Sequence, residues 1–566
     1  MNTNYRAMED SGMEPMESHS GIDGSLSPTS EQLPLDETPA GVSAGRGVSV
    51  YNQYQSSFFY LPNETKSMII RYLSFREITR LARVCKYLRD FVEREKTLER
   101  AWYRRFPSPR QDQLRTIATT KDGQQLRDWL KPFANEDTVE SLIKHRDKAY
   151  FPALLLFNNS KLMSQCKEFD LVKTAEMSKR HTVISATFSA DCRHALIATV
   201  AEEVEIHGRE NDGSWKLKAT INHNKTVRSA AFSSDGRHVV TASNDCTVKI
   251  YGLEDDGSWE IKANILHKIS VKWAAFSANG RHVVTNGYDA IMKICSQKDD
   301  GSWEEKESVK HNCPARSASL SYDGRYVLIV DTNNNATIYG QGDDGFWEIK
   351  STISHNYFVT SATFSADGRH MATTSEDGTA KICVLQANGS WKEILRISHY
   401  EVVYSANFSA DGSHMVTVSR DGTAEVYGQR VPGLWVKETT IVHNESVNSA
   451  DFSADGRHLV TTSDDHTAKI YGLEATESWV KKATIHHKGP VQRAAFSGDG
   501  CHVITTASDD NMANIYSLGV DGSWVKKATV QHEIASRPAN ISADGRHVLT
   551  FSDLNQVEIT ELRKKD

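Results

Sequence analysis

The chain has 566 residues, of which 39% are hydrophobic and 25% are charged, and its formal net charge is −7. This composition is typical of a globular protein, and the lack of a basic surplus argues against nucleic acid as a partner. No apolar run approaches the roughly 18–20 residues of a membrane-spanning helix. The eight scattered cysteines form no C-x-x-C pair, so we expect no membrane insertion, no zinc site and reduced thiols in the cytoplasm.

The first segment of the chain, residues 1–50, is acidic and polar. It contains eight acidic and two basic residues, a net charge of −6, and is rich in serine, glycine and proline. Such a segment has little apolar surface to bury, so we expect a disordered acidic leader. It is either a plain solvated tail or an export or regulatory segment.

Residues 61–102 have the pattern of a helical domain. Leu61 and Pro62 open a helix, because proline is tolerated in the first turn, where its missing N–H costs nothing. Two stretches of apolar residues at helical spacing follow, separated by "SFREI". They are Met68, Ile69, Tyr72 and Leu73, and then Leu81, Val84, Cys85 and Leu88. This pattern predicts a small helical domain over residues 55–104.

The same stretch closely resembles the F-box, a small helical module. The positions that agree with the family pattern are Leu61, Pro62, Glu64, Ile69, Ile70, Tyr72, Leu73, Ser74, Leu81, Val84, Cys85, Lys86, Leu98 and Trp102. Thr65 and Tyr87 depart from it. The resemblance implies that an apolar helical face docks onto the adaptor subunit of a cullin–RING ubiquitin ligase. The adaptor-binding residues it implies are Leu61, Pro62, Glu64, Ile69, Ile70, Leu73, Val84 and Cys85.

Residues 105–166 join this domain to the rest of the chain. Their segments "QQLRDWLKPF" and "TVESLIKHRDKAYFPALLLF" have a largely helical pattern. We expect a helical linker that sets the distance between the two neighbouring domains.

From residue 167 onward the chain repeats itself with a period close to 44 residues. A histidine marks each unit: His181, His223, His267, His311, His355, His399, His443, His487 and His532. A tryptophan marks eight of them: Trp215, Trp259, Trp303, Trp347, Trp391, Trp435, Trp479 and Trp524. Each unit contains four strand-like segments separated by turn residues, and "FSADGRH" spans the first turn. Four strands in ~40–45 residues are typical of a propeller blade.

The order of residues in each unit resembles the WD-repeat β-propeller over residues 167–566. In that family a histidine, a serine or threonine, an aspartate and a tryptophan hydrogen-bond inside each blade. His223, Ser243 and Asp245 match the first three, whereas Tyr251 stands at the place of the tryptophan. A histidine that recurs in every blade is interpreted as structural, so we expect no catalytic or metal-binding residue and no cofactor.

The number of blades follows from the number of repeats. Nine units predict nine blades, while eight would result if the first unit, with Ala201 and His207 at two repeat positions, had decayed. The segment "FDLVKTAEM" from Phe169 is the candidate for the missing outer strand. It would close the last unit onto the first and remove the open edges.

Some positions vary while their surroundings repeat, and these are candidates for partner binding. In the WD-repeat family such positions lie on one face of the propeller. The candidate target-binding residues are Arg228, Lys272, Tyr288, Arg316, Tyr404 and Arg420. Three of the basic residues lie on consecutive blades and suit an acidic or phosphorylated peptide. The alternative is drift on a solvated rim.

Three functions compete for this architecture. The first is a substrate receptor: the F-box docks the adaptor of an SCF-type ubiquitin ligase and the propeller binds an unknown target protein. The second is a protein-interaction scaffold not linked to ubiquitin, or a bacterial effector that mimics F-box proteins in the host cytoplasm. The third is a propeller enzyme, against which the sequence offers no Ser-His-Asp order and no phosphate loop. We therefore expect no enzyme.

Overall fold

The structure is a computed structural model that describes most of residues 61–565. The positions left out within that range are 72, 74, 120, 211, 312–314, 343–345, 432, 475, 509, 520, 532–538 and 552–554. The acidic leader predicted over residues 1–50 lies outside the described residues. The chain forms two units, Met1–Lys66 and Ser67–Asp566, and the packing described below is that of the second.

The amino-terminal part of the described chain is helical. Its helices are α2 (Asn63–Arg71), α3 (Phe75–Val84), α4 (Lys86–Arg94), α5 (Thr97–Arg104), α6 (Ser108–Thr119), α7 (Gly123–Leu130), α8 (Glu136–Ile143) and α9 (Phe151–Gln165). Helix α7 begins with a capping box, in which the Asp122 carboxylate accepts from the Gln125 backbone N–H at 2.8 Å. The Gln125 side chain accepts in return from the backbone N–H of Asp122. Local sequence therefore defines where this helix starts.

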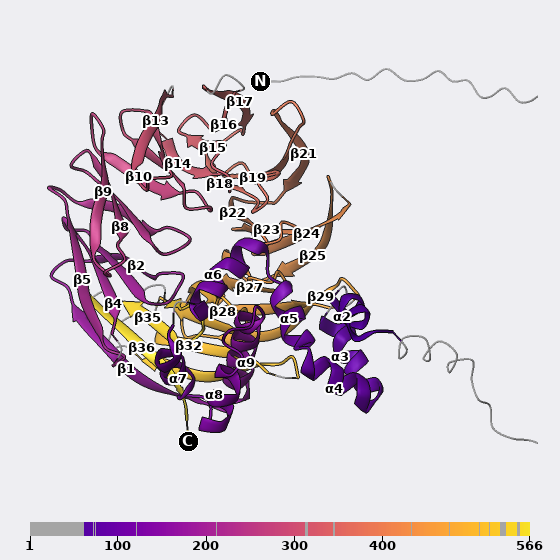
Figure 1. The fold of residues 1–566 in the computed structure, drawn as a ribbon. Coiled ribbons are helices and arrows are strands. Elements are labelled where there is room, and N and C mark those ends of the chain that lie inside the picture. The colour runs from indigo at the N-terminus through magenta and orange to yellow at the C-terminus, as the bar shows by residue number, and fades with distance from the viewer. Residues whose placement is uncertain are drawn as a thin grey trace, which may run out of the picture. The chain divides into compact units, whose positions relative to one another are not determined.

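Nine antiparallel sheets of four strands follow and form the blades of a propeller (Figure 1). Blades 1 to 3 are β2 (Val183–Phe188), β3 (His194–Thr199), β4 (Glu203–Arg209) and β5 (Trp215–Asn222); β6 (Val227–Phe232), β7 (His238–Ser243), β8 (Thr247–Leu253) and β9 (Trp259–Leu266); and β10 (Val271–Phe276), β11 (His282–Gly287), β12 (Ile291–Gln297) and β13 (Trp303–Lys310). Blades 4 to 6 are β14 (Ala315–Leu320), β15 (Tyr326–Asp331), β16 (Asn335–Gln341) and β17 (Trp347–Ser354); β18 (Val359–Phe364), β19 (His370–Ser375), β20 (Thr379–Leu385) and β21 (Trp391–Ser398); and β22 (Val403–Phe408), β23 (His414–Ser419), β24 (Thr423–Val431) and β25 (Leu434–Val442). Blades 7 to 9 are β26 (Val447–Phe452), β27 (His458–Ser463), β28 (Thr467–Leu473) and β29 (Trp479–His486); β30 (Val491–Phe496), β31 (His502–Ala507), β32 (Asp510–Leu518) and β33 (Trp524–Gln531); and β34 (Asn540–Ile541), β35 (His547–Phe551), β36 (Gln556–Lys564) and β1 (Phe169–Ser178).

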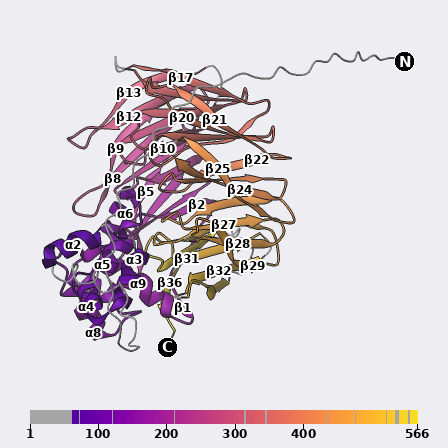
Figure 2. The ribbon, with the colours of Figure 1, turned by 90° about the vertical axis from the view of Figure 1, so that its right-hand side faces the viewer.

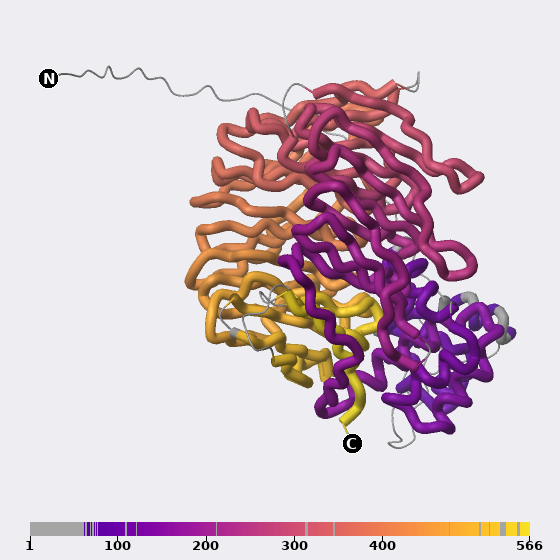
Figure 3. Tube along the Cα trace, turned by 90° about the vertical axis from the view of Figure 1, so that its left-hand side faces the viewer, coloured from indigo at the N-terminus to yellow at the C-terminus, as the bar shows by residue number. Residues whose placement is uncertain are grey.

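The ninth blade closes the propeller with strands from both ends of the repeat region. Strand β1 pairs with β36 in an antiparallel register that runs from Phe169 opposite Lys564 to Ser178 opposite Gln556. Figure 3 shows these two segments side by side. The prediction that the segment from Phe169 supplies the missing outer strand is confirmed, and the count is nine blades rather than eight. The first unit forms a complete blade.

The recurring "FSADGRH" segment is a tight hairpin between the two inner strands of a blade. In blade 2 the backbone N–H of Gly236 donates to the Ser233 carbonyl at 2.9 Å, and Gly236 has a φ of +72°, a left-handed conformation that favours glycine. The Asp235 carboxylate accepts from the backbone N–H of Arg237 at 2.9 Å. Ser, Asp and Gly are therefore needed by the turn itself, which explains why they recur.

The second recurring histidine and the recurring tryptophan contact each other across neighbouring blades. His194 of blade 1 meets Trp259 of blade 2 edge to face, with ring centroids 5.4 Å apart. The same contact recurs at other blade junctions, and His547 of blade 9 meets Trp215 of blade 1 at 6.1 Å. Between blades 4 and 5, Tyr326 takes the place of the histidine and meets Trp391 at 5.6 Å. In blade 9, Phe169 stands where the tryptophan would be and lies 6.0 Å from His502. Edge-to-face aromatic pairs thus help to seal the gaps between blades.

Candidate functional site

Apolar side chains are exposed on the first helices. Ile69 of α2 is 40% exposed, Val84 at the end of α3 is 55% exposed, and Tyr87 of α4 is 43% exposed. Helices α3 and α4 pack against each other, so Val84 and Tyr87 lie on neighbouring elements. Exposed apolar side chains such as Val84 and Tyr87, on two helices that pack together, are typical of a protein-binding face.

The other predicted adaptor-binding residues differ in their exposure. Leu73 and Cys85 are half-buried. Ile70 is fully buried, so it belongs to the core and is unavailable to a partner. Leu61 and Pro62 lie in the first unit, half-buried and exposed respectively, and Glu64 lies in α2; Tyr72 and Ser74 of the family pattern lie outside the described residues.

The helices from α5 to α9, here called the helical region, pack against one end of the propeller (Figure 2). This is the end that carries the "FSADGRH" turns. Arg105 pairs with Asp455 in the turn of blade 7 at 3.2 Å, and both side chains are largely buried. The Arg110 side chain donates to the Gly498 carbonyl in the turn of blade 8. The Ser160 hydroxyl lies 2.9 Å from the Cys501 sulfur in the same turn. Side-chain contacts therefore fix the helices to consecutive blades.

The strongest of these contacts involves blade 9. The buried guanidinium of Arg546 donates from Nε and Nη2 to the Asn159 amide oxygen, at 2.8 and 2.6 Å. It also stacks on Trp129 of α7, 3.9 Å from the ring centroid. Burial lowers the pKa of Arg546 to about 9, so the side chain keeps its charge at neutral pH. Arg546, the arginine of the hairpin turn in blade 9, therefore binds the helical region to the propeller.

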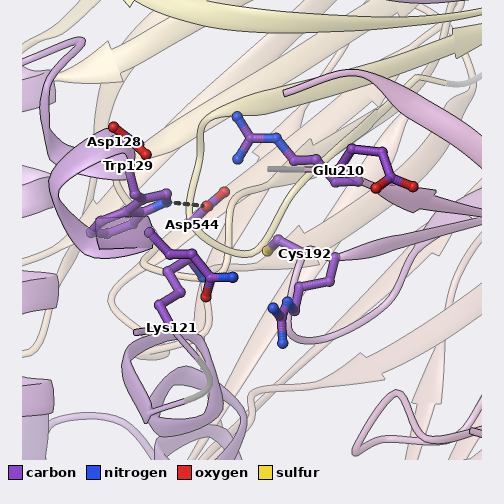
Figure 4. A pocket seen from close by; sticks show the side chains of 9 residues that line it. Lys121, Asp128, Trp129, Cys192, Glu210 and Asp544 are labelled. Atoms are coloured by element: carbon purple, nitrogen blue, oxygen red, sulfur yellow. Dashed lines mark hydrogen bonds between the residues drawn. The ribbon is translucent and has the colours of Figure 1, made fainter. Parts of the chain in front are cut away.

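A small cavity of about 90 Å³ lies at this junction (Figure 4). Its lining includes Lys121, Cys192 and Asp544, a combination that occurs in enzymes. The Trp129 indole donates to the Asp544 carboxylate at 3.0 Å, and Figure 4 shows the two side chains pointing toward each other.

The protonation of these groups argues against catalysis in the junction cavity. Burial raises the pKa of the Cys192 thiol well above its ordinary value, so no thiolate forms at neutral pH. Burial alone would raise the pKa of Asp544, but His547 and Arg546 lower it. Asp544 is therefore a carboxylate held among partners, and the cluster is a structural junction.

The opposite end of each blade holds the variable residues. Val227 at the start of β6 pairs with Ser243 at the end of β7, so Arg228 lies at the end of the blade remote from the hairpin turn. Lys272, Arg316 and Tyr404 occupy the same position on β10, β14 and β22. The predicted target-binding residues therefore share one end of the propeller, opposite to the helical region.

The repeat position that Arg228 and Lys272 occupy also links neighbouring blades, a role that the sequence did not indicate. The Lys272 ammonium donates to the Ala315 carbonyl at 3.3 Å, in the next blade. Asn448 makes the equivalent bond to the Val491 carbonyl at 3.0 Å. Lys272 is therefore partly occupied by a structural contact, whereas Arg228 and Arg316 are exposed.

Exposed aromatic rings lie at the same end of the propeller. Arg316 stacks on Phe358, 4.2 Å from the ring centroid. Tyr357 is 63% exposed and Tyr400 is 99% exposed. The sequence patterns did not single out these three aromatic residues. Tyr400 directly follows the marker histidine His399, and Tyr357 and Phe358 are the second and third residues after His355, so a comparison of the repeats at these places would have revealed them.

The remaining two predicted residues lie on the loops of the same end. Tyr288 follows β11 and is exposed. Arg420 follows β23 and lies 3.5 Å from the Glu401 carboxylate, with both side chains largely exposed. Such an exposed pair is weak, so a stronger anion can replace Glu401.

The marker histidines are structural, but their hydroxyl partner differs from the prediction. His223 lies 3.0 Å from the Asp245 carboxylate through Nδ1, and 2.8 Å from the Thr241 hydroxyl through Nε2. The Ser243 hydroxyl instead donates to the Lys225 carbonyl at 2.8 Å. Thr241 rather than Ser243 is thus the hydroxyl partner of the histidine. The two residues share one face of β7, but Ser243 lies at the end of the strand, where its hydroxyl bonds to the Lys225 carbonyl instead.

Two classes of site receive no support from the described part of the chain. Within those residues, no group of three or more His, Cys, Asp or Glu side chains is placed to hold a metal ion. Nor does any helix described here have the length and apolar character that crossing a membrane requires.

Comparison with known families supports both domains. The F-box-like model matches residues 58–105. The model of the WD domain, G-beta repeat, matches residues 215–252, 347–383, 391–427, 436–472 and 479–517. None of the curated proteins matches the sequence significantly.

Several solved structures resemble the chain at low identity. Sqt1 from Chaetomium thermophilum is 13% identical with a TM-score of 0.47, over 59% of this chain and 96% of that chain. The C-terminal WD40 domain of Sif2 is 14% identical with a TM-score of 0.45, over 57% and 92%. Sqt1 from Chaetomium thermophilum bound to the N-terminus of the ribosomal protein L10 is 15% identical with a TM-score of 0.44, over 58% and 94%. With TM-scores below 0.5, these likenesses carry no functional conclusion.

Proposed function

We propose that the chain is the substrate-recognition subunit of an SCF-type ubiquitin ligase, because it is an F-box protein with a WD-repeat propeller. The F-box binds the adaptor subunit, and the propeller holds a target protein. The chain supplies proximity to a transfer reaction that another subunit catalyses, and it is no enzyme itself. The place of action is the cytoplasm, or the host cytoplasm if the protein is a bacterial effector.

One observation carries this proposal. The helices that follow the F-box are fixed to the turn end of the propeller by buried contacts such as Arg546 with Asn159 and Arg105 with Asp455. At the opposite end, the described residues include exposed cations and exposed aromatic rings. A receptor needs this arrangement, because a target must be held at a defined place relative to the ligase.

The open end suits an acidic or phosphorylated segment of the target. Arg228 and Arg316 are exposed, and Arg420 has only a weak partner. Guanidinium groups form strong, charge-assisted hydrogen bonds to carboxylates and phosphates. The exposed rings of Tyr357 and Phe358, the second of which stacks with Arg316, offer apolar contact to the same segment.

Co-purification with the ligase adaptor tests the proposal. The intact chain is compared with a triple variant, Leu61→Ala, Pro62→Ala and Ile69→Ala. A matched control replaces three exposed apolar residues on outer strands, Leu217→Ala, Ile261→Ala and Val436→Ala.

We expect the adaptor to be recovered with the intact chain and with the control variant, and to be lost with the F-box variant. If the intact, folded chain recovers no adaptor, the receptor proposal fails. The protein would then be a propeller scaffold that is not linked to ubiquitin.

A further inference from the structure

A second cavity, of about 360 Å³, lies within the helical region. It forms where α5, α6 and the start of α9 meet. The residues that matter for its chemistry are Arg100, Tyr103, Arg104, Asp112, Arg115 and Tyr150. It shares no lining residue with the junction cavity, and it contains none of the predicted adaptor-binding or target-binding residues.

The cavity gathers positive charge. Arg100 and Arg104 are four residues apart on α5, which places both side chains on one face of the helix, and Arg115 comes from α6. Asp112 is the one carboxylate in the lining. Within the described residues, neither Arg100 nor Arg115 forms an ion pair. Arg104 donates to the Leu73 carbonyl at 3.5 Å. Three guanidinium groups around one carboxylate give the lining a positive charge, which attracts an anion.

The walls of the cavity are held in place by hydrogen bonds. The Tyr103 hydroxyl of α5 donates to the backbone carbonyl of Gln111 in α6. The Gln111 side chain donates in turn to the Phe106 carbonyl at 2.6 Å. Burial raises the pKa of Tyr103 to about 12, so the phenol stays neutral and adds no negative charge to the site. These bonds fix the junction of α5 and α6 that frames the cavity.

The lining also suits a ligand that carries a ring in addition to an anionic group. Tyr150 and Tyr103 contribute aromatic rings, and the first turn of the 15-residue helix α9 adds the positive end of its dipole. The volume falls within the range of about 300–1,000 Å³ that small-molecule sites occupy. A single phosphate ion would leave most of this space empty.

We propose that this cavity binds a small phosphorylated molecule that contains a ring, such as a nucleotide or a sugar phosphate. Arg100, Arg104 and Arg115 hold its phosphate group, because planar guanidinium groups match the oxygens of a phosphate. Tyr150 and Tyr103 contact its ring. None of the residues predicted to bind the adaptor or the target lines the site, although Arg104 contacts the backbone of Leu73, and the proposal does not depend on the receptor function.

Isothermal titration of the full chain tests the proposal with three probes: inorganic phosphate, AMP and glucose 6-phosphate. We expect one molecule of AMP or of glucose 6-phosphate per chain, bound more tightly than inorganic phosphate and more weakly as salt is added. The better of the two probes identifies the kind of ring. A bound ligand also raises the temperature of unfolding, which gives an independent readout.

Two variants, Arg100→Gln and Arg115→Gln, are expected to weaken the binding of the better probe by about tenfold or more, because each removes a charged hydrogen-bond donor. The control is Arg369→Gln, which changes an exposed arginine in a propeller turn and is expected to bind as the unchanged chain does. The unfolding temperature without ligand shows whether each variant is folded. No binding of any probe at millimolar concentration, or undiminished binding by both folded variants, would overturn the proposal.

Discussion

Replacement of Asn159 by leucine tests whether a buried polar contact holds the helical region to the propeller. Asn159 lies in α9 and is 1% exposed. Its amide oxygen accepts two hydrogen bonds from Arg546, and its Nδ2 donates to the Asp544 carbonyl at 3.1 Å. Leucine has a similar size, so the substitution removes these bonds without opening a large cavity.

The expected loss of stability follows from the polar groups that lose their partner in Asn159→Leu. The Arg546 guanidinium stays buried but loses both hydrogen bonds to the amide oxygen, and the Asp544 carbonyl loses a donor. A buried charged donor left without its acceptor costs about 3 kcal/mol, the upper end of the range for an unsatisfied buried polar group, because the guanidinium cannot return to water. A loss of this size corresponds to a factor of a hundred or more in the equilibrium for local opening.

Hydrogen exchange of the backbone amides in α9 measures this opening. Asn158→Leu is the matched control, since the neighbouring Asn158 is only half-buried and donates to the Leu154 carbonyl within its own helix. We expect fast exchange across α9 in Asn159→Leu and nearly normal exchange in Asn158→Leu. Equal protection in the two variants would refute the idea that Asn159 anchors the helices.

Three further predictions concern the propeller. Burial lowers the pKa of His547 to about 4 in the folded chain, whereas a histidine in the unfolded chain has a pKa of about 6.5. Between these two pH values the unfolded chain binds a proton that the folded chain does not bind. The free energy of unfolding therefore falls by about 3 kcal/mol as the pH drops from about 6.5 to 4. Urea unfolding at pH 7 and pH 4.5 should show a smaller difference for His547→Gln than for the unchanged chain, and an identical difference would contradict the assignment. Trp259→Ala should destabilise the propeller by about 3–5 kcal/mol, because the buried ring seals blades 1 and 2, while Tyr400→Ala removes a fully exposed ring and should leave the unfolding midpoint unchanged. Gly378→Ala should lower the melting temperature more than Gly257→Ala does: both glycines have a positive φ, but a Cβ at Gly378 would lie 3.0 Å from the His399 carbonyl oxygen and one at Gly257 would meet nothing within 4 Å. Equal melting temperatures for these two glycine variants would show that the close approach has no cost.

The architecture was predictable because its determinants are local. Each hairpin needs the residues of its own turn, such as Asp235 and Gly236, and each blade needs the same four strands. The number of blades and the closing strand from Phe169 followed from counting repeats. Comparison of the repeats also placed Arg228 and Arg316 at one end of the propeller, because equivalent positions in equivalent blades share an end.

The sequence did not show which partner a side chain contacts or whether it is buried. Ser243 and Thr241 are both hydroxyl residues near the end of one strand, and only the geometry showed that Thr241 meets His223. The bond from Lys272 to the next blade was equally hidden, because the sequence does not show how closely two blades approach. Ile70 matched the family pattern as well as Ile69 did, but it is buried.

The sequence by itself therefore determined the helical domain, the propeller, a count of nine repeats and the end at which variable residues gather, since periodicity and turn chemistry act over a few residues. The structure decided that all nine repeats form blades. Only the tertiary structure decided which turns the helical region covers. Its contacts join residues as distant as Asn159 and Arg546, and no local pattern distinguishes Arg546 from the exposed arginines of other turns. The cavity of the three arginines has the same origin, because it exists only where three separate helices converge.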